Sequence, residues 1–272
     1  MLADLDAEAH LARARLALRN AVAVVPHPGA DGLAAAALGL RARNERASAA
    51  VLLDSDPFAP GAPIPDGPLA IIDWGIRAID RPVLLVDHTM PEVAPRDDQV
   101  FVSGYGEIPI IPSAALLRRL VRESPLWLAE IGIATEIGAE HVSHDARQLA
   151  ALADAPRRVP DGPVRTALEV LTAHDDIVDA LADHRVAELD DARRTWKAAV
   201  DRVMRTVEPE HHGDVSVVRF DSECVLEDVV ARSWALRLPG SQVIAVRNGV
   251  HVGGQAARLP QERLARLLRS RP

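Results

Sequence analysis

The chain has 272 residues, 48% of them hydrophobic and 26% charged, which is typical of a folded globular protein and excludes a disordered one. Its formal net charge of −8 argues against a protein that coats nucleic acid nonspecifically, because such binding depends on neutralising phosphates. A single cysteine, Cys224, excludes an internal disulfide and a cysteine-built zinc site. No apolar run reaches the roughly 18 residues of a membrane span, and acidic residues stand where a secretion signal is positive. We therefore expect a cytoplasmic protein without membrane contact.

The first half of the chain alternates helical patterns with short apolar runs. Residues 6–20 show helical spacing, the run 21–25 ends at Pro26, and a glycine-containing turn leads into an Ala/Leu-rich helix at 33–43. Further buried-type strands are expected at 49–53, 69–73, 83–87 and 100–103. Uninterrupted apolar runs of this kind predict an α/β fold with a parallel sheet that is covered on both faces.

The second half predicts helices followed by a smaller α/β unit. Helices are expected at 113–123, with Ser113 as its N-cap, and at 126–137, after a proline-rich loop at 57–68. Residues 144–207 are expected to form successive helices that link the first part of the chain to the last unit. Strands at 215–220 and 243–246 and helices at 225–238 and 260–269 make up the last unit. His211 and His212 are expected in a solvated loop before it.

Polar side chains follow three of the predicted strands. His27 and Asp31 follow the first strand, Asp73 ends another, and His88 directly follows a third; Glu136, late in a helix, could join them. Ligands of open α/β sheets collect beyond the carboxyl ends of the strands. Imidazole and carboxylates without sulfur are ligands for Mn²⁺ or Mg²⁺. An aspartate at a strand end ordinarily caps a helix or turn, but four coincident positions favour a metal site.

The motifs at these positions resemble those of the DHH phosphoesterase superfamily, in its RecJ-like branch. His27-Pro-Gly-Ala-Asp31-Gly is similar to the first motif, Ile72-Asp73-Trp-Gly75 to the second, Asp87-His88-Thr89 to the Asp-His-His that names the family, and Gly132-Ile-Ala-Thr-Glu136 to the fourth. The resemblance covers nearly the whole chain. It implies a DHH-type metal-binding domain at 1–142, a helical linker at 143–212 and a small α/β DHH-associated domain at 213–272.

The resemblance implies a hydrolase, exonuclease-like, that uses Mn²⁺ or Mg²⁺ to cut phosphodiesters of single-stranded nucleic acid or short oligonucleotides. It implies metal ligation by His27, Asp31, Asp73, His88 and Glu136 and catalytic roles for Asp87, His88 and Thr89. Two residues depart from the family pattern. Gly29 stands where a ligand aspartate of the second ion is expected, which predicts that only one ion binds. Thr89 stands where a second histidine would contact the scissile phosphate, and a hydroxyl carries no charge.

The charge distribution predicts where a polyanion would bind. From Asp214 to Pro272 there are nine arginines against six acidic residues, whereas the preceding part is strongly acidic. Arg247, Gly253, Gly254 and Arg258 are therefore the expected substrate-binding residues, because glycines let backbone amides approach an anion closely. The alternative to substrate binding is that Arg247 and Arg258 are solvated charges on the protein surface.

Two functions stay open from the sequence. Retention of His27, Asp31, Asp73, His88 and Glu136 favours a metal-dependent phosphoesterase, with nucleic acid as its partner. Gly29 and Thr89 favour a catalytically impaired RecJ homologue that binds proteins in a replication or repair assembly.

Overall fold

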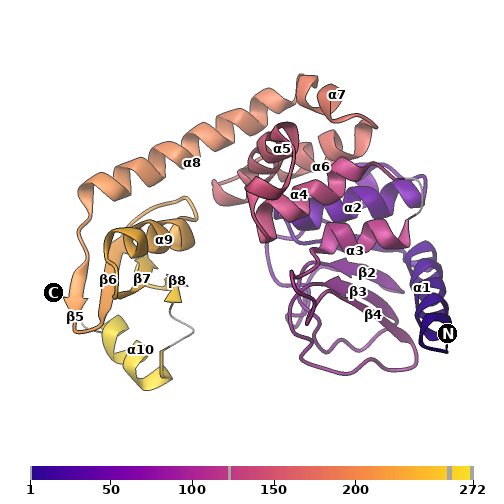
Figure 1. Cartoon of the computed structure of the whole chain (residues 1–272), viewed down its shortest axis with the longest axis horizontal. Coiled ribbons are helices and arrows are strands. Elements are labelled where there is room, and N and C mark those ends of the chain that lie inside the picture. Colours follow the sequence, from indigo (N-terminus) through magenta and orange to yellow (C-terminus); the bar gives the residue numbers. More distant parts are fainter. Residues whose placement is uncertain (1, 122–123, 256–258, 270–272) are drawn as a thin grey trace. The chain divides into compact units, whose positions relative to one another are not determined.

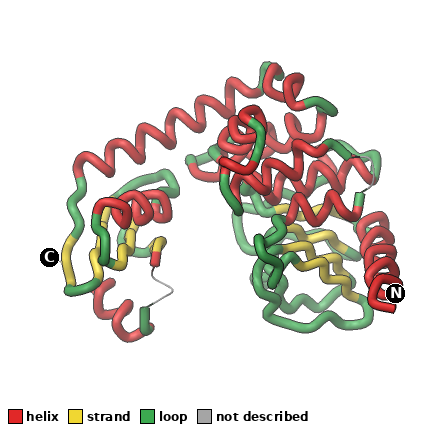
Figure 2. Tube along the Cα trace, in the orientation of Figure 1, coloured by secondary structure: helices red, strands yellow, loops and turns green. Residues whose placement is uncertain are grey.

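The computed structural model describes residues 2–121, 124–255 and 259–269. The chain divides into two compact units, and each has its own sheet and core (Figures 1 and 2). The first comprises Met1–Pro156 and Pro163–Asp190, and the second Arg157–Gly162 and Asp191–Pro272. Among the described helices, none combines the length and apolar character needed to span a membrane.

The first unit is built on a four-stranded parallel sheet. Its strands run side by side in chain order, namely β1 (Ala23–Pro26), β2 (Leu69–Ile72), β3 (Val83–Asp87) and β4 (Gln99–Ser103). All residues of β1, β2 and β3 are buried, as the uninterrupted apolar runs predicted. The predicted parallel sheet is thus confirmed, and all four carboxyl ends lie at one edge.

The strand expected at 49–53 does not form. Residues 47–49 make a 3₁₀ turn, and Ala50 has only an isolated parallel bridge to Val24 of β1. The next amide, Val51 N–H, still donates to Val24 O at 2.9 Å. The chain then runs toward the proline-rich loop, which begins at Pro57. The segment therefore pairs with β1 over two residues only, Ala50 and Val51.

The helices of this unit lie on one side of the sheet, some in contact with its strands and the others packed on those helices. They are α1 (Leu2–Asn20), α2 (Ala30–Ala42), α3 (Ser113–Leu120), α4 (Leu126–Glu136), α5 (His144–Asp154), α6 (Val164–Ala173) and α7 (Ile177–Ala182). Helix α2 is buried throughout residues 30–40 and packs against α3, α4 and α6. Its alanines let these helices approach closely. Helix α3 is shorter than the predicted 113–123; residues 122 and 123 lie outside the described residues.

The other face of the sheet is covered by loops. Val25, Ile71 and Leu85 point to this side and pack against side chains of the loops around Phe58 and Trp74. Figure 2 shows these connections beside the sheet as long loop segments. The side chains of Val24, Ile72 and Val86 pack instead with the helices. The alternation of adjacent residues between two cores follows from the two-residue period of a strand.

The second unit holds a mixed sheet in the order β5 (Glu210–His212), β6 (Val215–Phe220), β7 (Gln242–Arg247) and β8 (His251–Gly254). The central pair is parallel and both outer pairs are antiparallel. Helix α9 (Glu227–Arg237) packs on one face, and α10 (Gln261–Arg269) on the other. Helix α8 (Val186–Thr206) begins in the first unit and continues into the second. His211 and His212 lie in β5, not in a loop, because their backbones pair with β6.

Candidate metal centre

The carboxyl edge of the parallel sheet carries the polar side chains expected from the sequence. His27 directly follows β1, Asp73 directly follows β2, and His88 directly follows β3. Asp31 lies in the first turn of α2, and Glu136 is the last residue of α4. Neighbouring parallel strands end at the same edge of the sheet, so His27, Asp73 and His88 come together there.

These five side chains form one cluster around His88. Its Nδ1 lies 3.3 Å from Asp73 Oδ1 and 3.6 Å from Asp31 Oδ2, and its Nε2 lies 3.4 Å from Glu136 Oε2. His27 Nδ1 lies 3.8 Å from Asp73 Oδ2. One ligand atom from each of Asp31, Asp73 and His88 falls within 4.8 Å of the other two, a spacing that could hold a metal ion.

Asp31 is held by the start of helix α3. The backbone N–H groups of Ser113 and Ala114 donate to its two carboxylate oxygens, each at 2.8 Å. Asp31 is 2% exposed, so these bonds and the positive end of the α3 dipole replace the water that the carboxylate loses. Each oxygen keeps a further lone pair for the cluster.

Gly132 of α4 makes room for this arrangement. A Cβ atom at position 132 would lie 2.2 Å from Asp31 Oδ1, and also near the side chains of Pro112 and Ala114. No side chain fits that space. The glycine in the fourth motif therefore has a steric role beside Asp31.

Ser113 is the cluster residue that the sequence did not reveal. The N-cap of α3 is Pro112, and Ser113 is the first helical residue, so the predicted capping role is wrong. Its hydroxyl instead donates to Asp73 Oδ1 at 2.8 Å, from a fully buried position. A serine at a helix start ordinarily indicates a cap, and nothing in the local sequence distinguishes the two roles.

Asp73 combines an uncommon backbone with an unfavourable charge environment. Its φ of 66° lies in the left-handed region, which costs free energy for a residue other than glycine. Its N–H donates to Val86 O at 2.8 Å, which ties this turn to β3. Burial and the nearby Asp31 carboxylate raise the pKa of Asp73 to about 7. Hydrogen bonds to Asp31, Asp73 and Glu136 raise the pKa of His88 to about 12.

Asp87 and Thr89 lie beside the cluster and bind each other. Asp87 is 1% exposed, and its Oδ2 accepts the Gly75 N–H at 2.6 Å. Its Oδ1 accepts both the N–H and the hydroxyl of Thr89. Asp87 therefore joins the loops that follow β2 and β3 through both of its carboxylate oxygens.

The cluster opens into a cavity of about 480 Å³. Its lining includes His27, Asp73, His88 and Glu136 together with Thr89 and Arg77. Trp74 also lines it and meets the His27 ring edge-on, with ring centroids 4.9 Å apart and an interplanar angle of 79°. The metal-type residues thus face a space that a small ligand could enter.

The expected substrate-binding residues have local structural partners in the second unit. Arg247 is only 8% exposed, and its Nε lies 3.0 Å from Glu227 Oε1. Gly253 and Gly254 pack against α9, where added Cβ atoms would lie 2.5 Å from Glu227 Cβ and Ala231 Cβ respectively. Arg247 is therefore paired and largely buried, and Arg258 lies outside the described residues.

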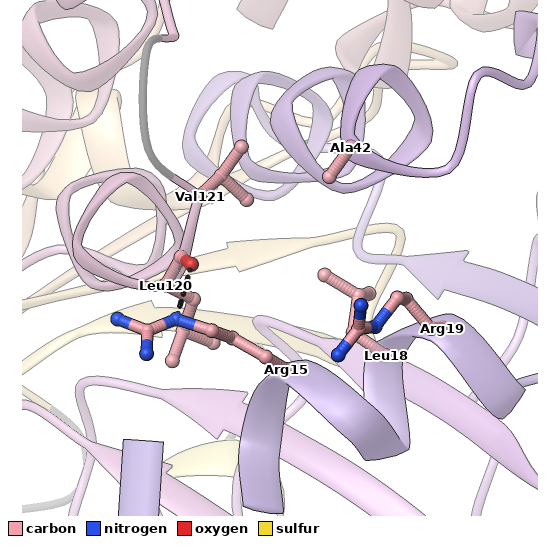
Figure 3. A pocket seen from close by; sticks show the side chains of 6 residues that line it. All are labelled: Arg15, Leu18, Arg19, Ala42, Leu120 and Val121. Carbon is pink, nitrogen blue, oxygen red and sulfur yellow. Dashed lines mark hydrogen bonds between the residues drawn. The ribbon is translucent and has the colours of Figure 1, made fainter. Parts of the chain in front are cut away.

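A second cavity of about 480 Å³ lies at the carboxyl ends of α1 and α3 (Figure 3). Arg15 Nε donates there to Leu120 O at 3.0 Å, and the described lining also includes Arg19 and Val121. Arginines at helix carboxyl ends stabilise the exposed carbonyls. Its described lining contains no carboxylate or imidazole, so it offers none of the metal ligands found beside His88.

Comparison with known proteins identifies the fold. No protein-family profile and no curated protein sequence matches the chain. Among solved structures, exonuclease RecJ bound to manganese aligns with a TM-score of 0.58 and 18% identity, over 88% of this chain and 80% of that one. RecJ from Thermus thermophilus in complex with Mn²⁺ aligns with a TM-score of 0.58 and 19% identity, over 88% of this chain. This chain spans 46% of that RecJ, less than half of its length.

A third match extends the likeness beyond RecJ. The DHH domain of a protein that belongs to a family of ribosomal proteins aligns with a TM-score of 0.53 and 12% identity, over 89% of this chain and 76% of that one. Identities this low establish a shared fold and not a shared substrate. The α/β architecture, the parallel sheet and these alignments agree, and the chain shares the fold of these RecJ and DHH-domain structures.

Proposed function

We propose that the chain is a RecJ-like DHH phosphoesterase that hydrolyses phosphodiesters of single-stranded nucleic acid or short oligonucleotides with a divalent metal ion. The observation that supports this most directly is the cluster of Asp31, Asp73 and His88 at the carboxyl edge of the sheet. The solved RecJ structures that share the fold contain Mn²⁺ or Mg²⁺. The name of one of them, exonuclease RecJ, extends the proposal to cleavage at strand ends.

The chemistry of the cluster fits a divalent cation. Two buried carboxylates lie beside each other, and their repulsion contributes to the raised pKa of Asp73. A bound cation would offset that repulsion, and oxygen and imidazole donors suit Mn²⁺ or Mg²⁺. Asp31, Asp73, His88 and Glu136 would hold it. When bound, such an ion supplies Lewis acidity for phosphoryl chemistry.

We further propose that a single ion binds. Gly29 provides no side chain, and its backbone N–H donates to His27 Nδ1 at 3.1 Å. Nδ1 is the His27 atom nearest to Asp73, so the amide competes for the lone pair that a second ion would need. Among the described residues, the identified metal-type group contains Asp31, Asp73 and His88 and does not include His27.

A second candidate function is a binding protein in a replication or repair assembly. The specific observation in its favour is that Thr89 donates its hydroxyl to Asp87. A hydroxyl has one proton to donate, so in this arrangement Thr89 cannot also donate to a phosphate. The expected catalytic roles of Asp87 and Thr89, the domain boundaries and the cytoplasmic location stay predictions.

One experiment separates the two candidates. Mn²⁺ binding is measured by calorimetry, and hydrolysis is followed with an end-labelled single-stranded oligonucleotide, for the wild type, Asp73→Asn and Asp54→Asn. Asp54 is exposed on a loop and serves as the matched control. We expect Asp73→Asn to abolish both readouts and Asp54→Asn to change neither. Mn²⁺ binding without turnover would support the binding protein, and a wild type that binds no Mn²⁺ would overturn the metal-dependent enzyme.

A further inference from the structure

The cavity beside the candidate metal centre is lined by Arg77, whose side chain carries a permanent positive charge. Among the described residues that line it, Arg77 is the only arginine or lysine, whereas Asp73, Asp87, Glu92 and Glu136 bring carboxylates. Thr89 brings no charge. A phosphate that enters this acidic cavity would therefore meet Arg77 as its fixed cationic partner among the lining side chains.

Arg77 is held rigidly at that position. Its Nη1 and Nη2 donate to the two carboxylate oxygens of Asp56, each at 2.7 Å, and Nη2 also donates to Trp74 O at 3.2 Å. The guanidinium lies over the Phe58 ring, 4.3 Å from its centroid. The side chain is nevertheless 30% exposed. An arginine fixed in this way loses little conformational entropy when it binds an anion.

The Nε atom of Arg77 lies close to Gly75, as the Thr89 hydroxyl does. The hydrogen bonds described for Arg77 use Nη1 and Nη2, and not Nε. A Cβ atom placed on Gly75 would lie 3.7 Å from Arg77 Nε and 3.9 Å from Thr89 Oγ1. The two side chains therefore flank the same glycine, and its lack of a side chain leaves the space between them open.

We propose that Arg77 binds a phosphate group of the substrate in this cavity, with its Nε edge beside Thr89. The inference rests on the proposed function, because it names the residue that recognises the phosphate in the same site. Asp56 orients the guanidinium, and it also offsets part of its charge. The competing explanation is purely structural: the Asp56–Arg77 pair links the loop before β2 to the loop after it.

The variants Arg77→Met and Asp56→Asn distinguish these explanations. Methionine keeps an apolar chain over Phe58 but removes the charge. Asparagine keeps an acceptor for Arg77 and removes the charge that offsets it. If Arg77 binds phosphate, Arg77→Met weakens binding, whereas Asp56→Asn leaves it equal or stronger. If the pair only links two loops, both variants weaken binding to the same extent.

The measurement is calorimetric titration of the Mn²⁺-loaded full chain with thymidine 5′-monophosphate, with thymidine as the uncharged comparison. We expect Arg77→Met to lower the affinity for the monophosphate on the order of 10-fold or more, the size expected for a lost hydrogen bond to a charged group. Thymidine should bind all variants alike. Arg77→Lys, which retains the charge, should lose less, and thermal unfolding checks that each variant is folded.

The outcomes separate this inference from the proposed function. Arg77 contacts none of the proposed ligands, so Mn²⁺ affinity should be the same in the wild type, Arg77→Met and Asp56→Asn. A wild type that binds no Mn²⁺ overturns the proposed function and the inference with it. Normal Mn²⁺ and monophosphate binding in Arg77→Met, or equal losses in both variants, overturns the inference alone.

Discussion

The Ser113 hydroxyl donates a hydrogen bond to Asp73 Oδ1 across 2.8 Å, although 40 residues separate the two in sequence. The same serine donates its backbone N–H to Asp31 Oδ2, also at 2.8 Å. One residue thus contacts two of the three carboxylates of the candidate metal centre, those of Asp31 and Asp73. Ser113 makes both contacts from a fully buried position.

Ser113→Ala is expected to weaken Mn²⁺ binding by about 10-fold, because a hydrogen bond to a charged group contributes roughly 1.5–3 kcal/mol. The loss of this donor makes the charged form of Asp73 less favourable. Calorimetric titration with Mn²⁺ measures the change. Ser103→Ala, which removes an exposed hydroxyl at the end of β4, is the control and should bind like the wild type. Equal affinities for all three proteins would show that Ser113 does not support the metal ligands.

Gly29→Asp with Thr89→His is expected to add a second Mn²⁺ and to raise hydrolysis of a model phosphodiester. Gly29 is the N-cap of α2 with a φ of −74°, so aspartate fits its backbone and is a favoured cap. Metal content per chain and turnover are the two measurements. Gly29→Asn with Thr89→His is the matched control, since asparagine caps equally well without a charge. If the aspartate variant gains neither metal nor turnover over this control, the two departures do not limit activity.

Gly132→Ala is expected to displace Asp31 and abolish Mn²⁺ binding, because the new Cβ would lie 2.2 Å from Asp31 Oδ1. Gly39→Ala, within α2, is the control, since its Cβ would lie 3.5 Å from Leu18 in ordinary contact. That change should stabilise the protein by about 0.5–1 kcal/mol, because alanine is the better helix former. Urea unfolding and Mn²⁺ titration of both variants test the contrast. Undiminished Mn²⁺ binding by Gly132→Ala would contradict the proposed steric role.

Asp183→Asn is expected to destabilise the protein at neutral pH and to have a smaller effect in acid. A hydrogen bond from Arg185 holds the pKa of the Asp183 carboxyl well below its ordinary value of 3.8, and His174 Nε2 lies 2.7 Å from Asp183 Oδ2. The side chain is 5% exposed. A depressed folded-state pKa contributes stability that is fully present above the unfolded pKa and is lost as pH falls through the folded value.

Urea unfolding of the wild type and Asp183→Asn at pH 7 and below pH 3.8 checks this dependence. We expect a difference of about 1–3 kcal/mol at pH 7, since the variant weakens a buried charged network. The difference should shrink progressively below pH 3.8, because the carboxyl group becomes protonated in the unfolded wild type there while the folded state still keeps it charged. A difference that is constant with pH would show that charge is not its cause.

The sequence by itself determined the parallel sheet and the residues at its carboxyl edge. Short apolar runs between loops are typical of buried strands, and a side chain that directly follows a strand must lie at its end. His27, Asp73 and His88 meet for that reason. The same reasoning failed at 49–53, where the run is equally apolar but only Ala50 and Val51 pair with β1.

Only the tertiary structure decided which groups hold these side chains in place and which charged side chains are paired. Asp31 depends on N–H groups more than 80 residues away, Ser113 faces Asp73 and does not cap its helix, and Arg247 is paired with Glu227 and buried. Each contact joins segments whose approach is set by the packing of whole helices and strands. Local residue patterns predict which side chains are buried and whether a segment is a helix or a strand. A hydrogen-bond partner at such a separation is a consequence of the complete fold.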